Sequence, residues 1–224
     1  MRARRLRWLP AALVGAFGLG CACFGPRDCP PGTVSEADQC VAADCLSESF
    51  DVWDDDAYVY VDGTPFGPED GFSDGSASWP FLTIAEAIGP ALARGVPVMI
   101  APGHYDEVLA LDSTHDGLVI RGMCSTTTSL TGSSGSSVTL DGGPDTVVRI
   151  EDLRVYNEAQ AGIVVTSGLL ALDDVSVDRA VGSGILVQGR TARIEVGTAE
   201  IVDVGGGEDD AVPSYGLVAA DGGV

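Results

Sequence analysis

Five acidic residues recur at a fixed interval and are the first candidates for chemistry. Glu151, Asp173 and Glu195 are spaced 22 residues apart, as are Asp152 and Asp174. If successive repeats stack as neighbouring strands, equivalent side chains lie about 4.8 Å apart. Carboxylates at that separation repel one another, so either one of them protonates more readily or a cation bridges them. Calcium prefers carboxylate and backbone oxygens, which makes it the cation to consider.

A calcium site is the sharper of two interpretations of this acidic ladder. The other is a solvated ridge, in which aspartate serves turn geometry and the charges are screened by salt. We favour the ridge because the chain has 33 acidic residues, so such spacings arise without a site. We therefore expect no cofactor, with weak calcium binding at the five ladder residues as the alternative.

Basic and nucleophilic groups near the ladder are few. Arg154 and Arg179 are the cationic residues close to it, and the chain contains no lysine. His104 and His115 lie in turn-like segments, and the 22-residue repeat places no Ser or Cys beside either one. A hydrolase triad needs such partners in contact. No catalytic residue is therefore assigned.

The chain as a whole is strongly acidic. It has 224 residues and a formal net charge of −21 at pH 7, and four of its 12 arginines lie within the first seven residues. The remainder repels phosphate groups and anionic lipid headgroups. Nucleic acid is therefore not expected as a partner, and membrane attachment would need an anchor.

Residues 1–20 have the layout of a secretory signal peptide, with an arginine-rich start followed by an apolar stretch too short to span a bilayer. Cys21 follows Gly20 and resembles the lipobox cysteine of bacterial lipoproteins, although Gly18 stands where that family has Leu. We predict export, with a lipid on Cys21 holding the protein at the bacterial outer membrane or cell surface. Ordinary secretion and a retained hydrophobic anchor are the alternatives.

Residues 21–56 are interpreted as a tether. The segment is rich in Pro and Gly, shows no strand or helix periodicity, and has no His near its cysteines and no C-x-x-C pair, which disfavours a zinc site. Disulfides are the natural stabiliser of such a segment. Cys124 is expected to remain a thiol in the core, and the disulfide candidates are Cys23, Cys29, Cys40 and Cys45.

A domain over residues 57–224 begins with a predicted strand at Tyr58–Val61. Thr83 and Glu86 fit a capping box, which predicts a short or kinked helix that ends by Gly95, since Pro90 interrupts it. Strand character returns at residues 96–105. Beyond that, "GLVIRG" and "SVTLDG" are further predicted strands.

From residue 148 onward, apolar positions coincide when the chain is shifted by 22 residues. Ile163 matches Ile185, whose counterpart is Leu217 in a stretched third copy. The same shift aligns Ile150 with Leu172 and Ile194. Repeats this short hold two or three strands and cannot bury their apolar face alone, which is typical of a solenoid. We expect five or six coils from the length available.

The segment "DGSASWPFLTIAEAI" and the repeated "GIVV" and "GILV" strands resemble exported bacterial proteins of the pectin-lyase-like group. The matching positions are Asp74, Gly75, Ser76, Pro80, Phe81, Thr83, Ile84 and Ala87. The resemblance implies an all-β fold: a right-handed parallel β-helix solenoid with an N-terminal capping helix. It leaves function open, because the group includes enzymes and non-catalytic surface proteins.

We predict a non-catalytic cell-surface scaffold or a module that binds an extracellular polysaccharide or a surface protein. The alternative is a polysaccharide lyase or hydrolase that acts on acidic glycans, although the Trp-Ile-Asp-His motif of pectate lyases is missing. No capping element is evident behind "YGLVAADGGV". Since solenoid ends need covering, a domain truncated at its C-terminal end is expected, with self-association through that end as the alternative.

Overall fold

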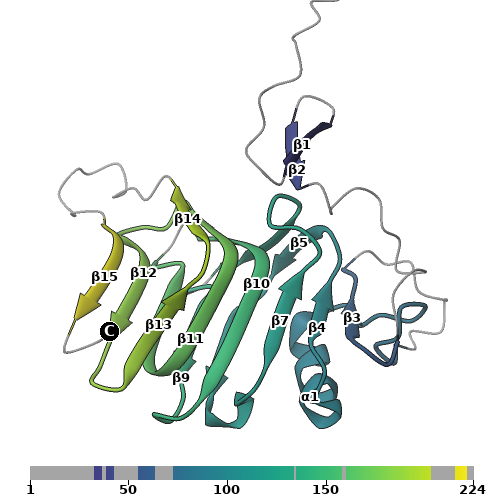
Figure 1. Cartoon of the computed structure of the whole chain (residues 1–224), viewed down its shortest axis with the longest axis horizontal. Coiled ribbons are helices and arrows are strands. Elements are labelled where there is room, and N and C mark those ends of the chain that lie inside the picture. The colour runs from purple at the N-terminus through teal and green to yellow at the C-terminus, as the bar shows by residue number, and fades with distance from the viewer. Residues whose placement is uncertain are drawn as a thin grey trace, which may run out of the picture.

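The computed structural model describes residues 33–36, 39–42, 55–63, 73–133, 135–157, 160–202 and 215–220. Most of the described chain is sheet, wound into a parallel β-solenoid of about 4 turns with a single α-helix near its N-terminal side (Figure 1). The predicted fold class is confirmed. The expected five or six coils were too many, because most turns of the solenoid need more than 22 residues.

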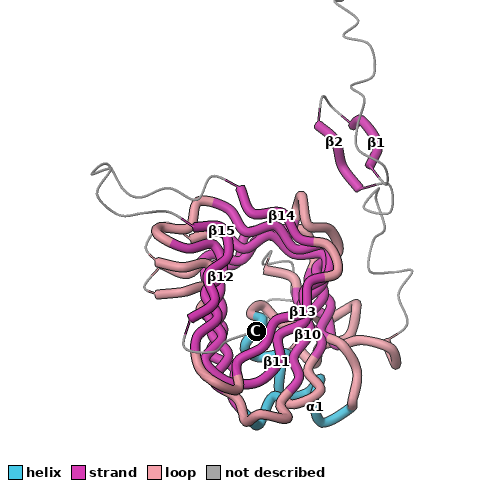
Figure 2. Tube along the Cα trace, turned by 60° about the vertical axis from the view of Figure 1, so that its left-hand side comes forward, coloured by secondary structure: helices cyan, strands magenta, loops and turns pink. Residues whose placement is uncertain are grey.

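The strands form three walls around a common interior (Figure 2). The first wall contains β3 (Val59–Val61), β4 (Val98–Ile100), β7 (Val119–Gly122), the start of β10 (Val147–Tyr156), the middle of β11 (Ile163–Asp178) and β13 (Ala192–Val196). The second wall contains β5 (Gly103–Asp106), β8 (Thr128–Thr131), the ends of β10 and β11, and β14 (Ala199–Val202). The third wall contains β6 (Leu109–Asp112), β9 (Val138–Asp141), the start of β11, β12 (Ser183–Gln188) and β15 (Tyr215–Ala220).

Inward-facing apolar side chains stack from coil to coil and form one core. On the second wall, Tyr105, Leu130, Val155 and Val177 are register partners in successive strands, and all are buried. Their outward neighbours are polar. This alternation places one apolar row inside and one polar row outside on each strand, as period-2 geometry requires.

The helix α1 (Ile84–Arg94) begins and ends as the sequence predicts. Thr83 and Glu86 form the capping box, and Gly95 closes the helix with a left-handed φ of 67°. The carboxylate of Glu107 accepts hydrogen bonds from the backbone N–H groups of Ile84 (2.8 Å) and Ala85 (3.1 Å). The apolar face of α1 packs against β3 and β4 and joins the core at the N-terminal end of the stack.

The predicted register on the third wall is confirmed. Ile185 is buried and pairs in parallel with Ile163 on one side and with Leu217 on the other. On the first wall the 22-residue alignment of the last coil is wrong: Leu172 pairs with Val196, not with Ile194. The cause is the turn at residues 188–191, which has two residues more than the equivalent turn at residues 166–167.

Two expectations about the cysteine-containing part of the chain need correction. The tether has regular structure, since β1 (Thr33–Glu36) and β2 (Gln39–Ala42) form an antiparallel hairpin. Cys124 is buried but is not a thiol, because it is disulfide-bonded. Residues 1–32, which include Cys21, Cys23 and Cys29, and also Cys45, lie outside the described residues, and for Cys40 only the backbone is described. Within the described part of the chain, no helix has the length and apolarity needed to cross a membrane.

Candidate functional site

The outer face of the second wall carries two rows of side chains that point away from the core. Register pairing places one row on His104, Ser129, Arg154, Ser176 and Glu200. The same pairings place the other row on Asp106, Thr131, Tyr156, Asp178 and Val202. Because the strands are parallel and in register, residues far apart in the sequence lie side by side on this face.

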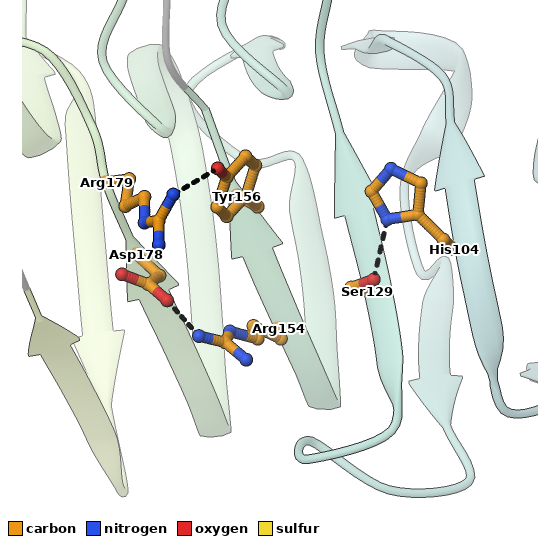
Figure 3. Close-up of a pocket in the computed structure, with 6 residues that line it drawn as sticks. All are labelled: His104, Ser129, Arg154, Tyr156, Asp178 and Arg179. Carbon is orange, nitrogen blue, oxygen red and sulfur yellow. Dashed lines mark hydrogen bonds and ion pairs between the residues drawn. The ribbon is translucent and has the colours of Figure 1, made fainter.

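A hollow of about 290 Å³ lies on this face. Its lining residues come from four successive strands or their ends and are His104, Ser129, Arg154, Tyr156, Asp178 and Arg179 (Figure 3). The expectation that the repeat places no Ser beside His104 was wrong, because Nδ1 of His104 lies 2.9 Å from Oγ of Ser129. Nε2 of the same ring lies 3.1 Å from the hydroxyl of Thr131.

Two arginines give the hollow its charge. The guanidinium of Arg154 forms an ion pair with the buried carboxylate of Asp178. Arg179 donates a hydrogen bond of 3.0 Å to the hydroxyl of Tyr156, and its guanidinium carbon lies 5.5 Å from the centre of that ring. Arg179 has a left-handed φ of 53°, which turns the chain at the end of β11. With two arginines and one aspartate, the hollow is locally cationic on a chain of net charge −21.

A second hollow of about 730 Å³ adjoins the first, and Arg154 lines both. It is lined by Ser125, Thr126, Arg154, Asp174, Val175, Ser176, Thr198, Ala199, Glu200 and Val202. We call the two hollows together the outer groove. One bank of it is the turn at residues 123–127, where Oγ of Ser125 donates a hydrogen bond of 3.1 Å to the carboxylate of Asp174. Cys124, at the base of this turn, is held by its disulfide.

The acidic ladder is only partly as predicted. Glu151 and Asp173 are register partners, and Asp152 and Asp174 occupy equivalent corners with left-handed φ values of 53° and 49°. Aspartate tolerates that conformation better than most residues, which agrees with a role in the turn. Glu195 does not continue the ladder, because it pairs with Ala171 after the longer turn before β13.

Glu151 differs from a solvated ridge residue, since it is buried and bound by arginine. Nε of Arg121 donates to its carboxylate at 2.8 Å, and Arg149 lies 3.6 Å from the other oxygen. Partial burial lowers the pKa of Arg121, but the nearby charges of Glu151 and Asp152 outweigh it, so the pKa is raised overall. Among the described residues, no three His, Cys, Asp or Glu side chains are grouped so that they could hold a metal ion.

His115 lies away from the outer groove. It follows a short 3-10 turn at Ser113–His115, and Nδ1 lies 2.9 Å from the carboxylate of Asp112. Hydrogen bonds from Thr114, followed by that from His115, lower the pKa of Asp112. These contacts close a turn on the third wall and give His115 a structural role.

The groove was missed at the sequence level because its residues follow a different interval. His104, Ser129 and Arg154 are each 25 residues apart, and this spacing was hidden by the 22-residue shift that fits the later coils. Comparison with known proteins adds no family to this geometry: no family model, curated protein or solved structure matches the chain.

Proposed function

We propose that the chain is an exported, non-catalytic β-helix module of the pectin-lyase-like type that binds a carbohydrate in its outer groove. The observation that carries the proposal is the Tyr156 ring, which lies among hydrogen-bonding side chains on the outer face of the second wall. Sugars present an apolar ring face and a rim of hydroxyls. A binding site for them therefore combines an aromatic surface with polar groups of fixed position.

The polar groups of the groove are held by one another. Arg154 is fixed by Asp178, and Arg179 by the hydroxyl of Tyr156. Side chains whose rotamers are already restrained lose less entropy when a ligand binds. The groove runs across neighbouring coils, so it suits an extended chain of sugars better than a single small molecule.

Export is supported by the disulfide at Cys124, since disulfides persist in oxidising compartments. We propose that Cys21 carries a lipid that anchors the protein at the bacterial surface, with the hairpin segment as part of the tether. Cys21→Ser should move the protein from the membrane fraction to the soluble fraction of the producing bacterium. An unchanged distribution would exclude the lipid anchor while leaving binding in the groove untouched.

The test of binding is a glycan array followed by titration of the glycans that are retained. Tyr156→Ala should weaken binding about five- to tenfold, since a stacked aromatic ring contributes about 1 kcal/mol. Tyr156→Phe keeps the ring and should stay within about twofold of the parent. Thr139→Ala, on the outer face of the third wall, is the control that should change nothing. If no glycan is retained, or if Tyr156→Ala binds as well as Thr139→Ala, carbohydrate binding at the groove is wrong.

Calcium enters the same experiment. Each titration is run with and without Ca²⁺, together with a melting curve of the free protein. Because Arg121 already neutralises Glu151, we expect little change in melting temperature and no calcium requirement for binding. A shift of many degrees at micromolar Ca²⁺ would favour a metal site at the acidic corner.

The alternative is a lyase or hydrolase that acts on acidic glycans, and the contact between Ser129 and His104 is the observation in its favour. In a hydrolase triad the second nitrogen of the base faces a carboxylate, whereas that of His104 faces the hydroxyl of Thr131. Turnover of uronate polymers or esters, abolished by His104→Ala or Ser129→Ala, would replace the binding proposal with an enzymatic one.

A further inference from the structure

The last coil of the solenoid exposes apolar side chains at one end of the stack. Within the described residues, each of its three strands pairs with a neighbour on one side only. Large hydrophobic residues of this coil that are about 40–50% exposed are Val196, Val202, Tyr215 and Leu217. Ile194 and Ile201 face the interior and are only partly buried, since no described coil covers them. Such an edge invites pairing with another strand.

The opposite end of the stack is closed. The outer edge of β3 is already hydrogen-bonded, because Tyr60 N–H donates to the carbonyl of Gly75 and Phe81 N–H donates to the carbonyl of Tyr60, both at 2.9 Å. The helix α1 packs beside this edge, at the end opposite β13, β14 and β15 (Figure 1). A second copy therefore cannot extend the solenoid head to tail, and a contact between copies must join the two exposed ends.

We propose that the last coil pairs with the last coil of a second copy across a two-fold axis that passes through Ile194 on the first wall. A two-fold axis normal to that wall reverses the strand direction, so β13 meets its counterpart as an antiparallel pair. The same rotation exchanges the other two walls, which brings β14 of one copy to β15 of the other. Interfaces of this kind are self-complementary, with residue i against residue j and j against i.

The backbone of β13 fits this pairing. Thr191 C=O and Gly197 N–H bond to β11, at 3.2 Å and 2.9 Å. Because N–H and C=O groups alternate along a strand, odd-numbered residues face β11 and Ile194 presents both of its groups to the exposed edge. Two copies of Ile194 opposite each other would then exchange two hydrogen bonds, which is the closely spaced pair of an antiparallel ladder.

The side chains of β13 also fit. Arg193 and Glu195 are exposed on the outer face of the wall, on either side of Ile194. With the axis at Ile194, each Arg193 lies directly opposite Glu195 of the second copy, which forms two favourable cross-strand pairs. On the interior side, Leu217 of one copy would approach Ile201 of the other and continue the core. The net charge of −21 opposes association, but at physiological salt its repulsion is screened beyond about 8 Å, while pairs in contact persist.

Sedimentation velocity on the full chain tests the proposal by mass. The expected species is a dimer, with twice the mass of the 23.0 kDa chain. Arg193→Glu places Glu against Glu at both pairs, and Glu195→Arg places Arg against Arg. Each single variant should weaken dimerisation about tenfold or more, since attraction becomes repulsion twice. The double variant restores both pairs and should dimerise like the parent.

Mixing the two single variants is the decisive measurement, because an Arg193→Glu copy and a Glu195→Arg copy complement each other in a heterodimer. Arg149→Glu, the same charge change on the same wall two coils away, is the control and should leave the dimer intact. A monomer at concentrations up to about 0.1 mM would overturn the proposal. So would a dimer that is unaffected by either single variant, or a mixture that fails to form heterodimers.

Discussion

Ile185 lies in the middle of an apolar stack, between Ile163 and Leu217 on the third wall. It is 1% exposed and sits opposite other aliphatic side chains of the same core. Ile185→Ala removes buried methyl and methylene groups and leaves a cavity that the rigid coils above and below cannot fill. The free energy of unfolding should fall by about 2–5 kcal/mol, measured by urea denaturation. The exposed neighbour Leu186→Ala should cost much less, and equal losses would mean that the two side chains are equally buried.

Tyr105 is a titratable group inside the core. Its hydroxyl donates to the carbonyl of Ala101 at 3.0 Å and accepts from Gly63 N–H at 3.3 Å. Burial raises the pKa of Tyr105 to about 12. In the unfolded chain the pKa is about 10, so the unfolded state loses its proton first as the pH rises.

The resulting prediction concerns alkaline stability. The contribution of Tyr105 should be fully present below about pH 10 and lost as the pH rises through 12. Tyr105→Phe should be less stable than the parent at pH 7 by about 1 kcal/mol, because the hydrogen bonds are lost. Between pH 10 and 12 the difference should shrink or reverse. Denaturation at a series of pH values measures it, and parallel profiles for the two proteins would contradict the burial of this hydroxyl.

The helix α1 depends on side chains that satisfy its first backbone N–H groups. Thr83 accepts from Glu86 N–H, and Glu107 accepts from Ile84 and Ala85. Thr83→Ala should destabilise the domain by about 1 kcal/mol. Glu107→Gln keeps an acceptor but removes the charge at the helix N-terminus, and should cost about 0.3–1 kcal/mol.

The control for the charge at Glu107 is Asp106→Asn, which removes the same charge from the exposed neighbouring position. Thermal unfolding of the three variants separates capping from net charge. If Asp106→Asn is as destabilising as Glu107→Gln, the carboxylate of Glu107 does not cap the helix. If Thr83→Ala has no effect, the helix end does not limit stability.

The same element explains how far the sequence predicts the structure. Thr83, Glu86 and Gly95 act within one helix, so local patterns were enough to place both of its ends. Ile163 and Ile185 were aligned correctly because their coils differ by no insertion. Glu195 was misplaced by a turn with two additional residues, and such a change leaves no local signal.

The candidate site was harder to predict than the fold. The outer groove draws on coils of unequal length, so no single interval brings Arg154, Asp178 and His104 together in the sequence. Polar residues on outer faces also lack the apolar pattern that identifies core positions. The hairpin at β1 and β2 was missed for a related reason, because strands of four residues are too short to display a period.

At the scale of the whole molecule, the disulfide at Cys124 is a long-range connection. Every other cysteine of the chain precedes residue 46, so the bond joins the corner of the solenoid beside the outer groove to the N-terminal segment. The closed loop includes at least residues 46–123 and therefore contains β3 and α1. Cross-linking so long a loop restricts the unfolded chain strongly, because loop-closure entropy grows with loop length.

Cys124→Ser should accordingly lower the free energy of unfolding by about 2–5 kcal/mol under oxidising conditions. Under reducing conditions the parent should lose this advantage and melt close to the variant, which separates the cross-link from the packing of the side chain. Because Ser125 reaches Asp174 from the same turn, the variant should also bind glycans less tightly in the outer groove. Peptide mapping without reduction provides the direct check. Recovery of Cys124 as a free thiol, together with equal melting of parent and variant, would show that the N-terminal segment is not tied to the solenoid.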